Sequence, residues 1–142
     1  MTIYAVIDTN VLVSALLAKH TDSATVQVIE RMFDKDFIPL YNDEIISEYN
    51  KVLHRPKFPF DESMISWTIQ AIIETGLSST RACTQDKPSD PKDIVFYEVA
   101  MSRNDSYLVT GNIKHFPSTP RVVTPKEMLK ILNASHQSDI DE

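Results

Sequence analysis

Acidic side chains in three separate stretches of the chain are the strongest candidates for chemistry. Asp8 directly follows the apolar run IYAVI (3–7). Glu48 lies in a segment of mixed polar and apolar residues, from Asp43 to His54, that has a helical pattern. Asp93 lies further along, in the sequence SDPKD. Carboxylate oxygens suit hard cations such as Mg²⁺ or Mn²⁺, which keep several waters and leave room for a phosphate oxygen. These residue types therefore predict a divalent-metal site that activates water for attack on a phosphodiester.

The composition gives little support to other catalytic chemistries. The 142-residue chain has one cysteine, Cys83, which excludes an internal disulfide and a thiolate zinc site and favours a reducing cytoplasm. The four histidines lack the spacing of zinc ligands, and no Ser/His/Asp arrangement is evident. With only two glycines in the chain, a glycine-rich phosphate loop is nearly excluded.

The charge balance gives a mixed indication about nucleic acid as a partner. The net charge is −6, whereas nucleic-acid-binding domains usually have a basic surplus. However, the C-terminal sequence ASHQSDIDE supplies three of the acidic groups, and bound metal would neutralise a carboxylate cluster. KVLHRPK (51–57) and the pair Lys114 and His115 provide local positive charge. The alternative interpretation of KVLHRPK is a solvated helix end, where cations interact favourably with the helix dipole.

The apolar N-terminal stretch does not predict a signal peptide or a membrane anchor. No Lys or Arg precedes the apolar run, and Asp8 and Asn10 interrupt it. A carboxylate in mid-membrane costs about 2.5–3.5 kcal/mol even on the mild insertion scale. We therefore expect a soluble protein without a membrane partner, in which this stretch forms a strand, a polar turn and a helix.

Short apolar runs alternate with helical patterns along the chain. Strands are predicted at 3–7, 37–41, 107–110 and 121–124, with a weakly signalled strand at 78–83. Helices are predicted from Val11, from Ser23 to about Lys35, from Asp43 to His54, from Asp61 to a C′ residue at Gly76, over 94–103, and over 125–132. The alternation predicts one α/β domain with a parallel sheet over residues 1–133, followed by a disordered acidic tail over 134–142.

Polar clusters follow two of the predicted strands. Asp8, Thr9 and Asn10 follow the first strand, and Thr110 and Asn112 lie at the end of the strand at 107–110. Ligand sites in parallel sheets lie beyond the carboxyl ends of the strands, so both clusters would reach one rim. Helix capping is the simpler explanation of the first cluster, but one cap residue would suffice where three occur. The clusters thus favour a functional site at this rim.

The other two acids each have a simpler structural explanation. Glu48 borders the apolar arc of its helix and can lean toward the interior, although a glutamate at such an edge is more often solvated. Glu44, one turn earlier, is the competing candidate. Asp90 before a proline is a good N-cap with Asp93 three residues later, so both acids could serve only to start a helix. That helix is apolar nearly all round, and its burial would bring Asp93 to the sheet.

Four segments resemble, in order, the PIN domain family of nucleases: VIDTNVLVSALL (6–17), DEIISEYNKVLHRPKF (43–58), DPKDIVFYEVA (90–100) and YLVTGNIKHFP (107–117). With the elements between them, the resemblance covers roughly residues 3–130. It implies a three-layer α/β/α sandwich with a central parallel sheet. It also implies a cluster of acids that binds Mg²⁺ or Mn²⁺.

The resemblance implies a role for individual residues. Asp8, Glu48 and Asp93 would be the metal ligands, and these three acids together with Asn112 would act in catalysis. The family often has a fourth acid after the VTG strand end, where this chain has Asn112, and an amide there adds an oxygen but no charge. The residues predicted to support the ligands or contact phosphate are Thr9, Asn10, Ser47, Asp90 and Thr110.

The resulting prediction is a Mg²⁺- or Mn²⁺-dependent endoribonuclease that cuts single-stranded RNA. Many bacterial proteins that resemble this one are toxins of toxin–antitoxin modules, so a protein antitoxin and a homodimer are further implied partners. The alternative is a non-catalytic PIN-like module that binds RNA or protein. A HAD-type phosphotransferase would need an acid where Asn10 stands, and a receiver domain would need an extra acidic pair and a later lysine.

Overall fold

A parallel β-sheet organises the chain, of which this computed structural model describes residues 2–141, with side chains to residue 135. Five short strands lie in the order β3-β2-β1-β4-β5. They are β1 (Tyr4–Ile7), β2 (Ile38–Tyr41), β3 (Leu77–Ser78), β4 (Ser106–Val109) and β5 (Val122–Val123). Central β1 pairs with β2 on one side and β4 on the other. The strand order thus reverses at β1 and β4, and sheets of this type place ligands beyond the carboxyl ends of the strands at such a point.

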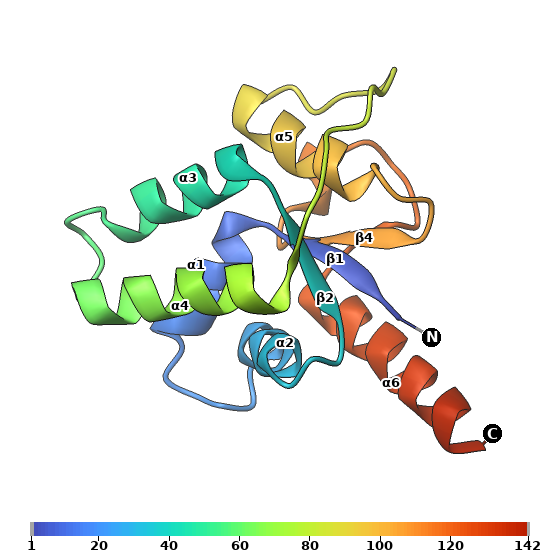
Figure 1. Ribbon diagram of the computed structural model, residues 1–142, viewed down its shortest axis with the longest axis horizontal. Helices are drawn as coiled ribbons and strands as arrows, with labels where there is room; N and C mark the ends of the chain where they lie inside the picture. Colours follow the sequence, from blue (N-terminus) through green and yellow to red (C-terminus); the bar gives the residue numbers. More distant parts are fainter. Residues whose placement is uncertain (1, 142) are drawn as a thin grey trace.

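Helices cover both faces of the sheet, as Figure 1 shows. The described chain contains α1 (Thr9–Leu17), α2 (Ala24–Phe33), α3 (Asp43–Leu53), α4 (Glu62–Thr75), α5 (Pro91–Ala100), α6 (Pro125–Asp141) and the 3-10 turn η1 (Ile113–His115). α5 packs on one face, with α3 beside it, and α1, α2 and α6 lie on the other. α4 contacts β2 at the margin. The predicted three-layer α/β/α fold with a parallel sheet is confirmed.

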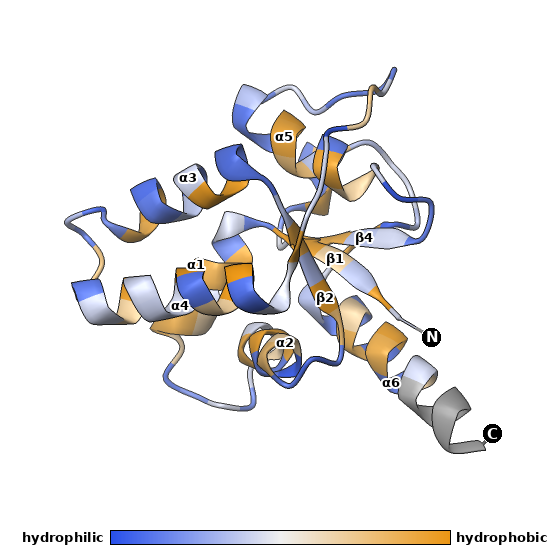
Figure 2. Cartoon of the chain, in the orientation of Figure 1, coloured by the Kyte–Doolittle hydropathy of each residue, from blue (hydrophilic) through white to orange (hydrophobic). Residues whose placement is uncertain are grey.

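The core lies on both sides of the two central strands, and apolar residues gather there in Figure 2. Val6 and Ile7 of β1 and Leu108 and Val109 of β4 are completely or almost completely buried. Each such side chain contributes about 1.5–3 kcal/mol to the free energy of folding when it is fully buried. The residues that directly follow these strands are therefore held on a rigid base.

The predicted elements are present, but several of their ends differ. α1 begins at Thr9 instead of Val11, and α5 begins at Pro91, three residues before the predicted start. The weakly signalled strand at 78–83 is only the two-residue β3, because the chain then leaves β2 to contact α5 through Ala82. The backbone of α6 is helical to Asp141. Side chains from residue 136 lie outside the described part, so the separate acidic tail stays a prediction.

Gly76 ends α4, but for a different reason from the one that the sequence suggests. Its φ is −98°, so it is not the left-handed C′ residue that we expected. Instead, the backbone packs closely here: a Cβ at this position would lie 2.5 Å from the Pro39 carbonyl oxygen and 2.6 Å from that of Ile72. Glycine is needed for this close approach to β2 rather than for an unusual φ.

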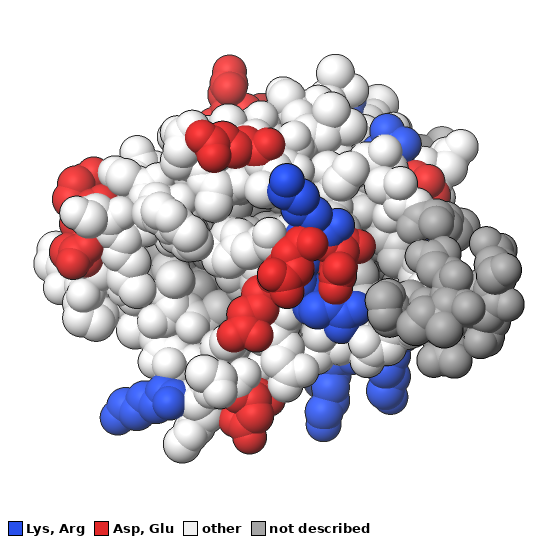
Figure 3. All heavy atoms as spheres, turned by 60° about the horizontal axis from the view of Figure 1, so that its bottom comes forward, with Lys and Arg blue, Asp and Glu red and all other residues white. Residues whose placement is uncertain are grey.

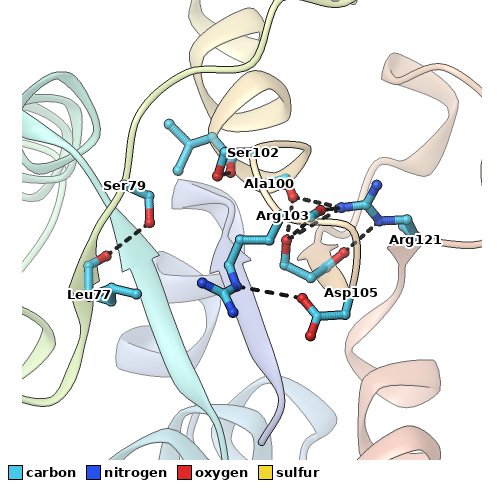
Figure 4. A network of polar contacts seen from close by, with 9 residues as sticks. Leu77, Ser79, Ala100, Ser102, Arg103, Asp105 and Arg121 are labelled. Atoms are coloured by element: carbon cyan, nitrogen blue, oxygen red, sulfur yellow. Dashed lines mark hydrogen bonds and ion pairs between the residues drawn. The ribbon is translucent and has the colours of Figure 1, made fainter.

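The C-terminal end of α5 is fixed by hydrogen bonds from one arginine, which Figure 4 shows. Arg121 donates from Nε to the Ser106 carbonyl oxygen at 2.8 Å and from Nη2 to the Ala100 carbonyl oxygen at 3.0 Å. It also donates to the Arg103 carbonyl oxygen. The side chain of Ser106, which is completely buried, donates to Ala100 as well. These bonds join the end of α5 to the start of β4.

One face of the molecule has charges of both signs. On the face that Figure 3 shows, toward the bottom of Figure 1, acidic and basic side chains lie beside one another near the centre of the view. A nucleic-acid-binding face usually has a basic patch instead.

No helix in the described part of the chain combines the length and the apolar composition needed to cross a bilayer.

Candidate active site

A cavity of about 220 Å³ lies beyond the carboxyl end of β1, next to the N-terminal ends of α1 and α5. Four carboxylates line it: Asp8, Glu48, Asp90 and Asp93. Its other lining residues are Thr9, Asn10, Val52, Arg55, Lys92, Phe96 and His115. These residues come from four parts of the chain. The cavity therefore brings together the three acids that the sequence predicts as metal ligands.

Asp8 occupies the N-cap position of α1, but its side chain does not cap the helix. The other helices with a described N-cap residue do have a side-chain cap: Ser23 for α2, Asn42 for α3, Asp61 for α4 and Asp90 for α5. Only the backbone carbonyl of Asp8 takes part, by accepting from Val11 at 3.0 Å. The Asp8 carboxylate therefore makes no cap hydrogen bond of the kind seen at these helices, although the Thr9 and Asn10 amides at the start of α1 lie near enough to favour its charge.

The Asp8 carboxylate is instead held between the sheet and the cavity. It is 6% exposed, and Oδ2 accepts a 2.7 Å hydrogen bond from the Thr110 hydroxyl, which is completely buried. Burial raises the pKa of Asp8 above its ordinary value, while the Thr110 bond, the backbone amides of Thr9 and Asn10, and nearby His115 act in the opposite direction. The carboxylate is thus costly to ionise in this place without a further positive partner.

Tyr49 supports the base of the site from α3. Its hydroxyl donates to the Ile7 carbonyl oxygen, one residue before Asp8, and its ring is buried. Burial, together with the nearby charge of Asp8, raises the pKa of Tyr49, so the hydroxyl stays protonated and remains a donor. This bond ties α3, which also contains Glu48, to the end of β1.

Asp93 lies on the first turn of α5 and faces the same cavity. Its pKa is raised to about 6, first by burial and then by the charges of Asp8 and Asp90, while His115 lowers it. Asp90 caps α5 by accepting from the Lys92 amide at 2.9 Å, whereas the Asp93 side chain accepts no hydrogen bond from any described residue. The helix start therefore explains Asp90 but not Asp93.

The structure separates the two candidate glutamates of α3. Glu44 accepts two 3.0 Å hydrogen bonds from Arg81, which also binds the buried Glu98 of α5. Glu48 is half-buried and lines the cavity. Glu44 thus belongs to an ion-pair network that joins α3, α5 and the chain after β3, and Glu48 is the glutamate available to the site.

The remaining predicted residues lie in three different settings. Thr9 lines the cavity, and its hydroxyl is buried without a hydrogen-bond partner in the described structure. Thr110 lies behind Asp8 and also accepts from the Asn112 amide at 3.0 Å. Asn112 and Ser47 are both exposed, and neither lines the cavity. A direct catalytic role for Asn112 and a phosphate contact for Ser47 find no support in this arrangement.

Sequence reasoning did not assign three cationic or titratable residues that line the cavity: Arg55, Lys92 and His115. The basic stretch at 51–57 contains Arg55, and His115 was noted only as part of a basic pair. Lys92 lies within SDPKD, a segment in which only the two acids were predicted to have a role. A local excess of positive charge was the available signal, but sequence alone cannot place a loop residue beside an acid from another element.

The donor set fits a partly hydrated Mg²⁺ or Mn²⁺ better than a fully enclosed ion. Among the described residues, no three His, Cys, Asp or Glu side chains converge closely enough to hold a metal. Mg²⁺, however, keeps several waters and is usually bound through only one or two carboxylates. Asp8 and Asp93 lie close enough for one charge to raise the pKa of the other, and the unpartnered Thr9 hydroxyl lies beside them. These oxygens, with Glu48 on the same wall, could hold such an ion through direct and water-mediated contacts.

The fold and the cavity define a parallel α/β protein with carboxylates beyond the switch point of its sheet. A family model described as PIN domain matches residues 4–114, which include Asp8, Glu48 and Asp93. The chain therefore belongs to the PIN domain family, whose members are typically metal-dependent nucleases. A comparison with curated proteins gave no match.

Proposed function

We propose that this protein is a Mg²⁺- or Mn²⁺-dependent endoribonuclease that hydrolyses phosphodiester bonds of single-stranded RNA. The observation that supports it most is that Asp8, Glu48 and Asp93, from distant parts of the chain, line one cavity. The Asp8 carboxylate also makes no side-chain cap hydrogen bond to α1. RNA as the substrate rests on the resemblance to PIN nucleases.

In this proposal, different residues of the chain hold the metal, orient its ligand and bind the substrate phosphate. A bound divalent ion would supply an activated water and offset charge on the phosphate. Asp8, Glu48 and Asp93 would hold that ion, and the Thr110 hydroxyl would fix the orientation of Asp8. Arg55 and Lys92, which line the same cavity, would attract and orient the substrate phosphate.

Two partner predictions accompany this proposal. A protein antitoxin would inhibit the nuclease by covering the cavity, and two copies of the chain would form a homodimer. Both predictions rest on the resemblance to toxin components of toxin–antitoxin modules.

One observation favours a second candidate function, a non-catalytic PIN-like module that binds RNA or protein. No three acids in the described structure converge on one point, as a closed metal site would require. The two functions differ in whether the chain cleaves RNA when metal is added, so one assay separates them.

The test is cleavage of a labelled single-stranded RNA in the presence of Mn²⁺. Asp8→Asn and Asp93→Asn should each lower the rate on the order of 100-fold or more, and a chelator should abolish cleavage. Asp61→Asn is the matched control, because Asp61 caps α4 away from the cavity and asparagine also caps well. Cleavage at the wild-type rate by folded Asp8→Asn and Asp93→Asn proteins would contradict the proposal.

A further inference from the structure

A second hollow adjoins the acidic cavity. It measures about 580 Å³ and lies between the loop 85–89 and the segment 114–118. His115 lines this hollow and also lines the cavity that contains Asp8 and Asp93. The two spaces therefore meet at this side chain, and a ligand longer than one phosphate could extend from one into the other.

The two spaces differ in charge. The hollow contains Lys87, Lys114 and one carboxylate, Asp86, whereas four carboxylates line the cavity. Lys87 Nζ lies 3.5 Å from Oε2 of the buried Glu98, and this ion pair offsets much of the positive charge of Lys87. Lys114 is exposed and forms no ion pair with any residue in the described part of the chain. Lys114 is thus the cation that remains available to an anionic ligand in the hollow.

Hydrogen bonds and an aromatic contact fix the position of the segment that contains Lys114. The η1 turn is closed by hydrogen bonds from the His115 amide to Asn112 at 3.0 Å and from the Phe116 amide to Ile113 at 3.2 Å. Phe116 is 7% exposed, and its ring stacks on that of Tyr97 in α5 with 6.4 Å between the centroids. Lys114 and His115 are therefore presented at a defined position relative to α5, which also contains Asp93.

We infer that this hollow is a subsite for the nucleotide next to the scissile phosphate of a single RNA strand. The inference rests on the proposed function. The strand passes from the carboxylates over His115 into the hollow, where Lys114 contacts the next backbone phosphate. Serine hydroxyls at Ser89 and Ser118 line the same hollow and offer further hydrogen bonds. Contacts of this kind to the backbone tolerate any base sequence.

Lys114→Ala tests the subsite through substrates of two lengths. For an octanucleotide, KM should rise roughly fivefold with kcat unchanged, because one exposed charge contact is lost outside the reacting centre. For a dinucleotide, which has a single phosphodiester, both constants should be unchanged. Lys19→Ala, which removes an exposed lysine just beyond the far end of α1, is the matched control and should change neither substrate.

Binding without catalysis gives a second readout. With a chelator present, anisotropy of a labelled octanucleotide should show that Lys114→Ala reduces the slope of log affinity against log salt by about 0.7, the value for one phosphate of a single strand. An unchanged slope and KM in a protein that still cleaves RNA would overturn the subsite while the proposed function stands. An equal loss for the dinucleotide would place Lys114 at the scissile phosphate and overturn it too. A wild-type protein that neither binds nor cleaves RNA would overturn both.

Discussion

The two ends of helix α5 differ in how well their polar groups are satisfied. At the C-terminal end, the carbonyl oxygens of Ala100, the last helical residue, and of Arg103, just beyond the helix, accept hydrogen bonds from Arg121 (Figure 4). At the N-terminal end, Asp93 accepts no bond from a described residue, and burial and two neighbouring carboxylates raise its pKa to about 6. One end of the helix stabilises the fold, whereas the other collects like charge. Perturbed carboxylates in a cavity are typical of functional sites, and stability alone does not explain them.

The start of α6 shows what a helix start looks like when it serves structure alone. The Thr124 amide donates to Glu127 at 3.0 Å, and the Glu127 amide donates to the Thr124 hydroxyl at 3.1 Å. This reciprocal pair satisfies two backbone donors. In α5, the Asp90 side chain accepts from the Lys92 amide instead of the Asp93 amide, and the Asp93 carboxylate does not bond back to Asp90. Aspartate is one methylene shorter than the glutamate used at this position, so its carboxylate stays free to face the cavity.

The largest effect on stability is expected at the C-terminal end of α5. Arg121→Ala should lower the free energy of unfolding by about 2–4 kcal/mol, because it removes a charged group that donates to the carbonyl oxygens of Ser106, Ala100 and Arg103 and leaves the last two only the Ser106 hydroxyl. Urea denaturation measures this loss. Arg31→Ala, which breaks a partly exposed pair with Asp36, should cost about 1 kcal/mol or less. Equal losses in the two variants would remove the contrast between this network and an ordinary surface pair.

A smaller effect of opposite sign is expected at the other end of the helix. The folded-state pKa of Asp93, about 6, is above its ordinary value of 3.8, so ionisation of this group opposes folding. The penalty is absent below the lower value, grows between the two and is complete above the higher one. Without metal, Asp93→Asn should therefore raise the free energy of unfolding at pH 8 by on the order of 1 kcal/mol, after allowance for solvent screening.

Urea denaturation of wild type and Asp93→Asn at several pH values in the presence of chelator measures this difference. The gain of the variant should be nearly constant above the folded-state pKa of about 6 and should shrink as the pH falls from there toward 4. A difference that stays constant over this range, or a variant that is less stable at pH 8, would show that Asp93 is not held in a strained ionised state.

The sequence predicted those features that follow from local pattern. Alternating apolar runs predicted the parallel sheet, and the polar residue after the first strand placed Asp8 at the rim, because a strand end fixes where the next residue lies. The helical pattern favoured Glu48 over Glu44, but the ion pair that engages Glu44 could not be predicted, since it depends on Arg81 reaching α3 from the chain after β3. His115 was missed for the same reason: its place beside the acids follows from the packing of η1 against α5.

Direct binding of metal tests the central claim most simply. Isothermal titration of Mn²⁺ into the wild-type protein should show binding, and Asp8→Asn and Asp93→Asn should each weaken it at least about tenfold, while Asp61→Asn binds as wild type does. A wild-type protein that does not bind Mn²⁺, or equal affinity in all four proteins, would contradict the claim that these carboxylates form a metal site.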